Sequence, residues 1–143
     1  MSKKESYVIS VSPRAKCYRH IQISGDATLL EFSSFILDSF NFQNDHLHAF
    51  FMNNRSFTDD DCYYLTPVEP ECNQRLTSDY KLNQVGLTQG KKFKYVFDFG
   101  DEWTFQCKVL RVLKSDTPVP KIIRSKGKAP SQYGDDEEED KDE

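Results

Sequence analysis

Apolar and polar residues alternate in several short segments of the chain, which is the period of a β-strand with one buried face. In the first segment Tyr7, Ile9 and Val11 point one way, and in the second Ile21 and Ile23 share a face. The pattern predicts strands near residues 6–12, 17–23, 46–52, 92–99 and 102–113.

A helical period replaces the alternation between the second and third strands and predicts one main helix at about residues 27–40. Thr28 can cap its start, and Glu31 lies three residues later, as in a capping box. The apolar stripe consists of Leu29, Phe32, Ile36 and Phe40. A small α+β domain needs one packed helix face, so we expect this stripe to be core.

The last two strands are predicted to form a β-hairpin around Gly100-Asp101, a pair suited to a type I′ or II′ turn. On the first strand one face carries Phe93, Tyr95, Phe97 and Phe99, and on the second one face carries Trp103, Phe105, Cys107 and Val109. A short helical turn near residues 78–85 would bury Leu82 and Val85.

The elements together predict an α+β fold: an antiparallel or mixed sheet of about five strands, one main packed helix and a C-terminal β-hairpin. We expect a disordered start at residues 1–5 and a single domain at residues 6–120. Residues 121–143 are expected to be a disordered tail, first basic and then acidic.

Composition narrows the class of protein. The chain has 143 residues, which fits one domain, and no run of 18 apolar residues that could span a membrane. The start lacks an apolar signal core, so we expect a cytoplasmic protein with reduced, packing cysteines at 17, 62, 72 and 107. A Cys62–Cys72 disulfide or shared zinc stays open as an alternative.

The net charge of −4 conceals two opposite parts of the chain. Residues 135–143 hold eight acidic residues and one lysine, a net charge of −7, whereas residues 1–134 carry 18 basic and 15 acidic side chains, a net charge of +3. The acidic end is expected to be a solvated tail; alternatively it covers a basic surface as a nucleic-acid mimic.

Several motifs occur in an order that resembles the plasmid pRiA4b ORF-3-like family, also labelled passenger resolvase-like proteins of IS1096-type elements. The motifs are Cys17-Tyr18-Arg19-His20-Ile21, Thr28-Leu29, Phe42-x-x-Asp45-His46-Leu47-His48-x-Phe50, and Phe93-x-Tyr95-x-Phe97-Asp98-Phe99-Gly100-Asp101-x-Trp103. The chain departs from the family at Tyr18 and Phe42, where tryptophan is typical, and at Phe105, where histidine is frequent. Residues 129–135 match the family's Cys-Pro-Pro-Glu-Asp-x-Gly-Gly-like ending only weakly.

The resemblance covers roughly residues 6–113, at most to 134, and implies an association with mobile elements without a defined biochemical role. Recombinase activity is not expected. Serine recombination needs arginines gathered round a nucleophilic serine and usually a helix-turn-helix, but the six arginines here are scattered.

Two histidines define a candidate metal site. His46 and His48 are two residues apart in a predicted strand, so their imidazoles share a face, and Asp98 and Asp101 are the natural carboxylate partners. Such a metal would activate water in a hydrolase or nuclease. The alternative is a buried hydrogen-bond network of the histidines and Asp98 that fixes the strand and the turn.

A nucleic-acid site is the other candidate. Lys91, Lys92 and Lys94 accompany an aromatic strand, and exposed aromatic rings beside lysines can stack bases. The alternative places these aromatic rings in the core, with the lysines at its rim.

We therefore expect a non-enzymatic binding module that engages a protein or nucleic-acid partner. Its surface is predicted around the hairpin tip and the His46–His48 strand, with Arg19, Lys92, Lys94 and Trp103 as binding residues. No cofactor is expected, although a divalent metal is possible in the alternative, a metal-dependent hydrolase using His46, His48, Asp98 and Asp101.

Overall fold

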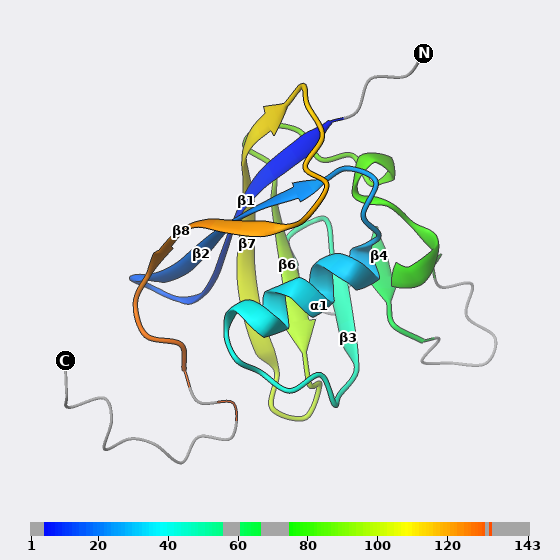
Figure 1. Cartoon of the computed structure of the whole chain (residues 1–143). Helices are drawn as coiled ribbons and strands as arrows, with labels where there is room; N and C mark the ends of the chain where they lie inside the picture. Colours follow the sequence, from blue (N-terminus) through cyan, green and yellow to red (C-terminus); the bar gives the residue numbers. More distant parts are fainter. Residues whose placement is uncertain (1–4, 56–60, 67–74, 131, 133–143) are drawn as a thin grey trace.

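The computed structural model describes residues 5–55, 61–66, 75–130 and 132. Among these residues eight strands form one sheet, and α1 (Leu29–Ser39) lies across one face of it (Figure 1). The α+β class is confirmed, but the sheet has eight strands instead of about five. The expected disordered start and acidic end, at residues 1–4 and 133–143, lie outside the described residues, as does Cys72.

The strand order is β5-β4-β3-β6-β7-β1-β2-β8. All neighbours pair antiparallel except β4 and β5, which pair parallel. The elements are β1 (Ser6–Arg14), β2 (Cys17–Ser24), β3 (His48–Phe51), β4 (Cys62–Tyr64), β5 (Arg75–Leu76), the 3-10 turns η1 (Thr77–Asp79) and η2 (Leu82–Gln84), β6 (Lys92–Phe97), β7 (Trp103–Leu113) and β8 (Lys121–Lys126).

Both ends of α1 are fixed by the local sequence. The capping box is present: Thr28 accepts from the backbone N–H of Glu31, whose side chain accepts from the N–H of Thr28. At the other end Asn41 adopts a left-handed conformation, and the Phe42 N–H donates to the Leu37 carbonyl at 2.9 Å. This Schellman motif ends the helix and turns Phe42 into the core.

The main core lies between α1 and the sheet. Phe32, Ile36 and Phe40 of the helix are completely buried or nearly so against inward-facing residues of the strands, which include Ile9, Ile21, Tyr95 and Phe105. Complete burial of one such side chain stabilises the fold by roughly 1.5–3 kcal/mol. The predicted apolar faces of the helix and of β7 are therefore confirmed, as is the burial of Leu82 and Val85.

The strand β8 corrects the expectation of a disordered basic segment after residue 120. Residues 121–126 pair antiparallel with β2, where Ile122 lies opposite Ile21. All six residues of β8 are exposed, so the segment has no buried alternating face to signal a strand. The segment is stabilised by its pairing with the edge of β2. This pairing cannot be predicted from the sequence of residues 121–126 alone.

The hairpin of β6 and β7 is confirmed, but its turn is longer than the predicted two residues. Phe97 pairs with Trp103, so residues 98–102 form the connection, and the left-handed residues are Asp98 and Glu102 instead of Gly100. The left-handed Asp98 interrupts the alternation. Phe99 consequently packs with Val96 in a second cluster on the sheet face opposite α1, away from Phe93, Tyr95 and Phe97.

No helix in the described part of the chain is long and apolar enough to cross a membrane.

Candidate functional site

His48 lies in a buried hydrogen-bond network. Its Nδ1 is 3.3 Å from Ser33 Oγ on α1, and its Nε2 is 3.0 Å from Thr77 Oγ1. Ser33 Oγ also contacts the Tyr95 hydroxyl at 2.5 Å. Burial lowers the pKa of His48 to about 4 and raises that of Tyr95, so both side chains are neutral at pH 7. The network joins α1 to β3, β6 and η1.

His46 lies at the rim of the sheet, before the start of β3, and its side chain is exposed. Its Nε2 is 3.5 Å from Asp98 Oδ2 and 3.4 Å from Asp45 Oδ1, and its ring packs edge-on against Phe97. The Asp98 backbone N–H donates to the Leu47 carbonyl at 2.8 Å. These contacts connect the hairpin tip to the segment that enters β3.

The structure thus brings only part of the predicted metal set together. His46 and Asp98 lie side by side, but both ring nitrogens of His48 have hydrogen-bond partners elsewhere, and Asp101 is exposed. Across residues 5–55, 61–66, 75–130 and 132, no three His, Cys, Asp or Glu side chains form a group that could hold a metal ion.

Arg19 is buried on the α1 side of β2. Its guanidinium lies 4.7 Å from the centre of the Phe40 ring and donates to the carbonyl of Ser39, the last residue of α1, at 3.2 Å. It also donates to the carbonyls of Lys126 and Gly127, each at 3.1 Å. A cation at a helix C-terminus stabilises the helix. Arg19 therefore ties α1 to the end of β8, with its donors directed at backbone carbonyls.

Trp103 is half-buried and packs edge-on against Phe42 at 4.9 Å between ring centres. Its indole N–H donates to the Gln132 carbonyl at 3.1 Å. The Gln132 side chain in turn contacts both backbone polar groups of Gln43. The tryptophan thus holds Gln132 beside the segment that follows α1.

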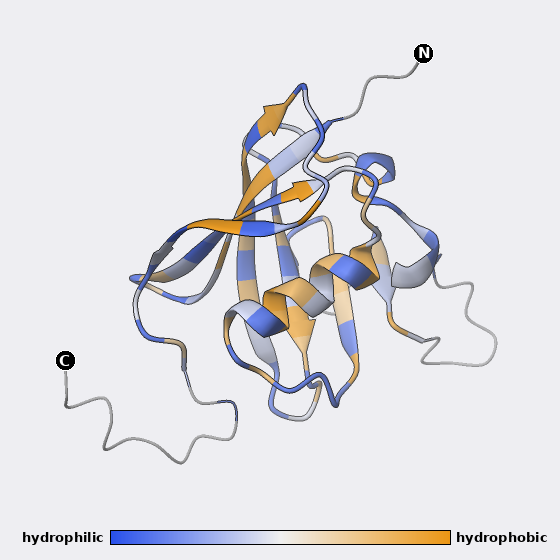
Figure 2. Ribbon diagram, viewed as in Figure 1, coloured by the Kyte–Doolittle hydropathy of each residue, from blue (hydrophilic) through white to orange (hydrophobic). Residues whose placement is uncertain are grey.

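Lys92 and Lys94 point to the opposite side of the sheet. Hydrophilic and hydrophobic residues alternate along β7 (Figure 2). On β6 successive side chains also point to opposite faces, so the lysines next to buried Phe93 and Tyr95 face away from α1. On this side the register forms one row across five strands: Lys92 opposite Lys108, Lys108 opposite Ser10, Ser10 opposite His20, and His20 opposite Arg124. At about 4.8 Å per strand the row is roughly 19 Å long.

We call this surface the basic face and define it by Lys92, Lys94, Lys108, Arg111, Arg124 and Lys126. The five adjacent strands β6, β7, β1, β2 and β8 contain no aspartate or glutamate. Within the described residues only Lys94 of the six has a side-chain hydrogen bond, to Gln106 at 3.2 Å, and none forms an ion pair.

Within the described residues, no ion pair offsets the repulsion between the cations of this face. Lys92 and Lys108 are direct cross-strand partners, and like charges in such a pair destabilise a sheet. Burial lowers the pKa of His20, and the nearby charges of Arg124 and Arg111 lower it further. Such an arrangement favours an anionic ligand that would neutralise the charges.

Tyr18 and His20 of β2, beside the edge strand β8, stack on each other on the basic face, with 4.6 Å between ring centres and 20° between ring planes. Both side chains are half-exposed. Among the residues that the structure covers, neither side chain has a hydrogen-bond partner, in contrast to His48 and Trp103. Their polar atoms and exposed ring surfaces are available to a ligand.

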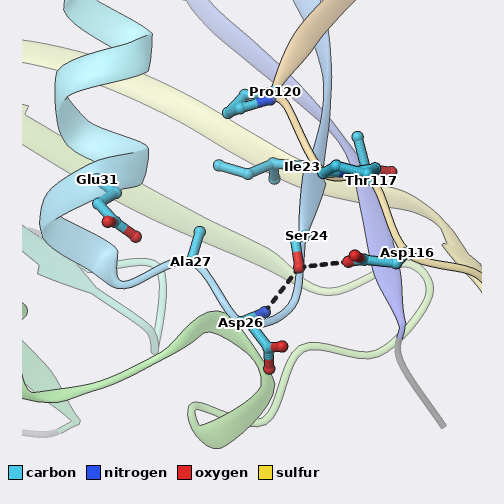
Figure 3. A pocket seen from close by; sticks show the side chains of 9 residues that line it. Ile23, Ser24, Asp26, Ala27, Glu31, Asp116, Thr117 and Pro120 are labelled. Carbon is cyan, nitrogen blue, oxygen red and sulfur yellow. Dashed lines mark hydrogen bonds between the residues drawn. The ribbon is translucent and has the colours of Figure 1, made fainter.

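Two pockets flank the segment that joins β7 to β8. One of about 430 Å³ lies between the start of α1 and this segment, and Asp26, Glu31 and Asp116 line it (Figure 3). Asp116 accepts from Ser24 at 2.9 Å, Glu31 belongs to the capping box, and Asp26 accepts from Asn83. The carboxylates thus already stabilise local structure. The second pocket, of about 410 Å³, is lined by Gln22, Lys121 and residues 116–120.

Of the residues on this face, the sequence pattern predicted only Lys92 and Lys94 as binding residues. It did not predict that the same surface includes Tyr18, His20, Lys108, Arg111, Arg124 and Lys126. The available signal was the scarcity of acidic residues: residues 6–14, 17–24 and 121–126 contain none, and the predicted strands 92–99 and 102–113 contain only Asp98 and Glu102, next to the turn. That these residues form one surface follows only from the strand order. In the sheet β6 pairs with β7 and β8 pairs with β2, so both strands extend the surface of β2, β1 and β7, one at each edge.

Comparison with known proteins gives a family and a related fold. The model of the family described as plasmid pRiA4b ORF-3-like protein matches residues 9–136, farther toward the C-terminus than the resemblance suggested. No curated protein matches the chain. The crystal structure of a protein of unknown function from Methanosarcina mazei Go1 is similar, with a TM-score of 0.74 and 23% identity; the match covers 93% of this chain and 76% of that one.

Proposed function

The chain belongs to the plasmid pRiA4b ORF-3-like family, and we propose that it is a non-enzymatic binding module whose basic face engages nucleic acid. One observation carries the proposal: five adjacent strands without an acidic residue present six basic side chains on the face that α1 leaves open. Phosphates would neutralise charges that have no ion-pair partner in the described structure.

The proposal moves the binding surface away from the hairpin tip. Lys92 and Lys94 keep the binding role expected from the sequence. Arg19 and Trp103 take structural roles, because Arg19 donates to carbonyls of α1 and β8 and the Trp103 indole donates to Gln132. The association with mobile elements implied by the resemblance stays a prediction.

Salt dependence tests the proposal. We expect the full chain to bind a fluorescently labelled oligonucleotide with an affinity that falls linearly on a log–log plot against salt. Lys108→Gln with Arg124→Gln removes two phosphate contacts, so the slope should become shallower by about 1.4, at about 0.7 for each contact with a single strand.

Lys81→Gln is the matched control, because Lys81 is exposed and lies beside the start of α1, on the other side of the sheet. It should leave the slope unchanged. Equal effects of the two variants, or no salt-dependent binding at all, would contradict the proposal and leave a protein partner as the remaining class.

The proposal assigns no metal to the protein. Elemental analysis of purified protein should find no stoichiometric zinc, manganese or iron, because both ring nitrogens of His48 are engaged in hydrogen-bond contacts with Ser33 and Thr77. A stoichiometric metal that is lost in His46→Ala and in Asp98→Ala would support the metal-dependent hydrolase instead.

A further inference from the structure

In the described part of the chain, the stacked pair Tyr18–His20 has no hydrogen-bond partner that would explain its position. It lies on an open sheet face and does not belong to either of the two apolar clusters. The register places Lys126 opposite Tyr18 and Arg124 opposite His20, so each ring has a basic neighbour. This arrangement suits an unpaired nucleotide, because an aromatic ring can stack on its base while a neighbouring cation contacts its phosphate.

The composition and position of α1 are unsuited to recognition of a duplex. A helix that enters the major groove must approach two phosphate backbones, and it normally carries basic residues for that purpose. The helix α1 carries Glu31 and Asp38 and no lysine or arginine. It also lies on the face opposite the cations, so the two elements cannot act together on one groove.

The exposed rings of Tyr18 and His20 favour a single-stranded nucleic acid as the ligand. Bases in a duplex already stack on one another, whereas unpaired bases can stack on aromatic side chains of a sheet. The row of Lys92, Lys108 and Arg124 runs across the strands next to the pair and provides contacts for successive phosphates.

We infer that the ligand of the basic face is a single-stranded nucleic acid, one base of which stacks on the Tyr18–His20 pair while its phosphates follow the row Lys92–Lys108–Arg124. This inference rests on the proposed function and specifies its ligand. Stacking on an aromatic side chain strengthens binding roughly 5- to 150-fold for each base.

The test uses the full chain and three probes: a single-stranded oligonucleotide of about 12 nucleotides, the duplex of the same sequence, and inorganic polyphosphate, which has no bases. We expect the single strand to bind more tightly than the other two at equal salt. Tyr18→Leu should weaken single-strand binding roughly 5- to 150-fold with an unchanged salt slope, and it should leave polyphosphate binding unchanged.

Tyr18→Phe is the matched control, because it keeps the ring and should keep the affinity. Equal unfolding midpoints of the two variants verify that Tyr18→Leu is folded. Duplex binding as tight as single-strand binding, or a Tyr18→Leu variant with the affinity of the original chain, would overturn the inference and leave the proposed function standing. Absence of salt-dependent binding to all three probes would overturn both.

Discussion

His48 shows how one side chain can be chemically suitable for a metal and still serve the fold. An imidazole can donate from one nitrogen and accept at the other, and here Ser33 and Thr77 engage both. The residue joins α1, β3 and η1 at the centre of the core, where removal of a polar partner leaves another buried polar group unsatisfied.

The stability of the protein should depend on pH through His48. Its pKa is about 4 in the folded state and near 6.5 in the unfolded state. The unfolded chain therefore takes up the proton first, so the stabilising contribution is complete above pH 6.5 and is lost as the pH falls toward 4. The loss amounts to about 3 kcal/mol.

Denaturation of the original chain and of His48→Gln at pH 7, 5.5 and 4.5 measures this effect. The free energy of unfolding of the variant should fall less steeply with decreasing pH. Parallel curves for the original chain and His48→Gln would show that His48 is not the titrating group.

Among the elements, the position of β8 depends on Gly127, where the backbone passes very close to the backbone of Lys16 and Cys17. This residue has a φ of +85°, and a Cβ added there would lie 2.5 Å from the Lys16 carbonyl oxygen and 2.8 Å from Cys17 Cα. Both neighbours are backbone atoms of the β1–β2 turn and its exit, which cannot rotate away. The Gly127 carbonyl also accepts from Arg19.

Gly127→Ala should therefore detach β8. Gly90→Ala is the matched control, since Gly90 has a φ of +90° but open space around it. Gly90→Ala should cost only the left-handed strain of about 1–2 kcal/mol, and Gly127→Ala clearly more. Hydrogen exchange should show lost protection at β8 only in Gly127→Ala, together with weaker oligonucleotide binding because Arg124 and Lys126 move. Equal protection in the two variants would contradict this role.

The elements that the sequence predicted have a buried alternating or helical face of their own, except β3, which is buried at all four positions. The strands β1, β2, β6 and β7 each bury such a face, and α1 has a capping box at its start. The missed strands are short or exposed: β4 has three residues, β5 has two, and β8 has no buried residue. Each of these strands forms because it pairs with the edge of another strand, which the sequence of the short segment does not reveal.

The same limit applies to the candidate site. Strict alternation along the predicted strand 92–99 would place Asp98 on the face of Lys92 and Lys94, but its left-handed conformation directs its carboxylate to His46. Arg19 has a charge suited to a binding surface, but its place between Cys17 and Ile21 on the inner face of β2 buries it. Side-chain chemistry was readable from the sequence, whereas the face that each residue occupies required the register.

At the scale of the whole molecule, charge is divided between parts of the chain. Residues 135–143 carry a net charge of −7 and residues 1–134 a net charge of +3. A negative net charge of −4 repels phosphates at a distance, while the basic face attracts them nearby. Unfavourable long-range repulsion of this kind slows and weakens association at low ionic strength.

Neutralising the acidic end should therefore strengthen binding to the single-stranded probe. Replacement of all eight acidic residues of 135–143 by asparagine or glutamine should raise the affinity at low salt, and replacement of the first four should give about half the change in log affinity. The gain should shrink as salt rises, because the screening length falls from about 30 Å at 0.01 M to about 8 Å at 0.15 M. Asp38→Asn with Asp79→Asn removes two exposed charges elsewhere and should have a smaller effect. An affinity that does not respond to the eight substitutions at low salt would mean that the charge of this segment does not act on the basic face.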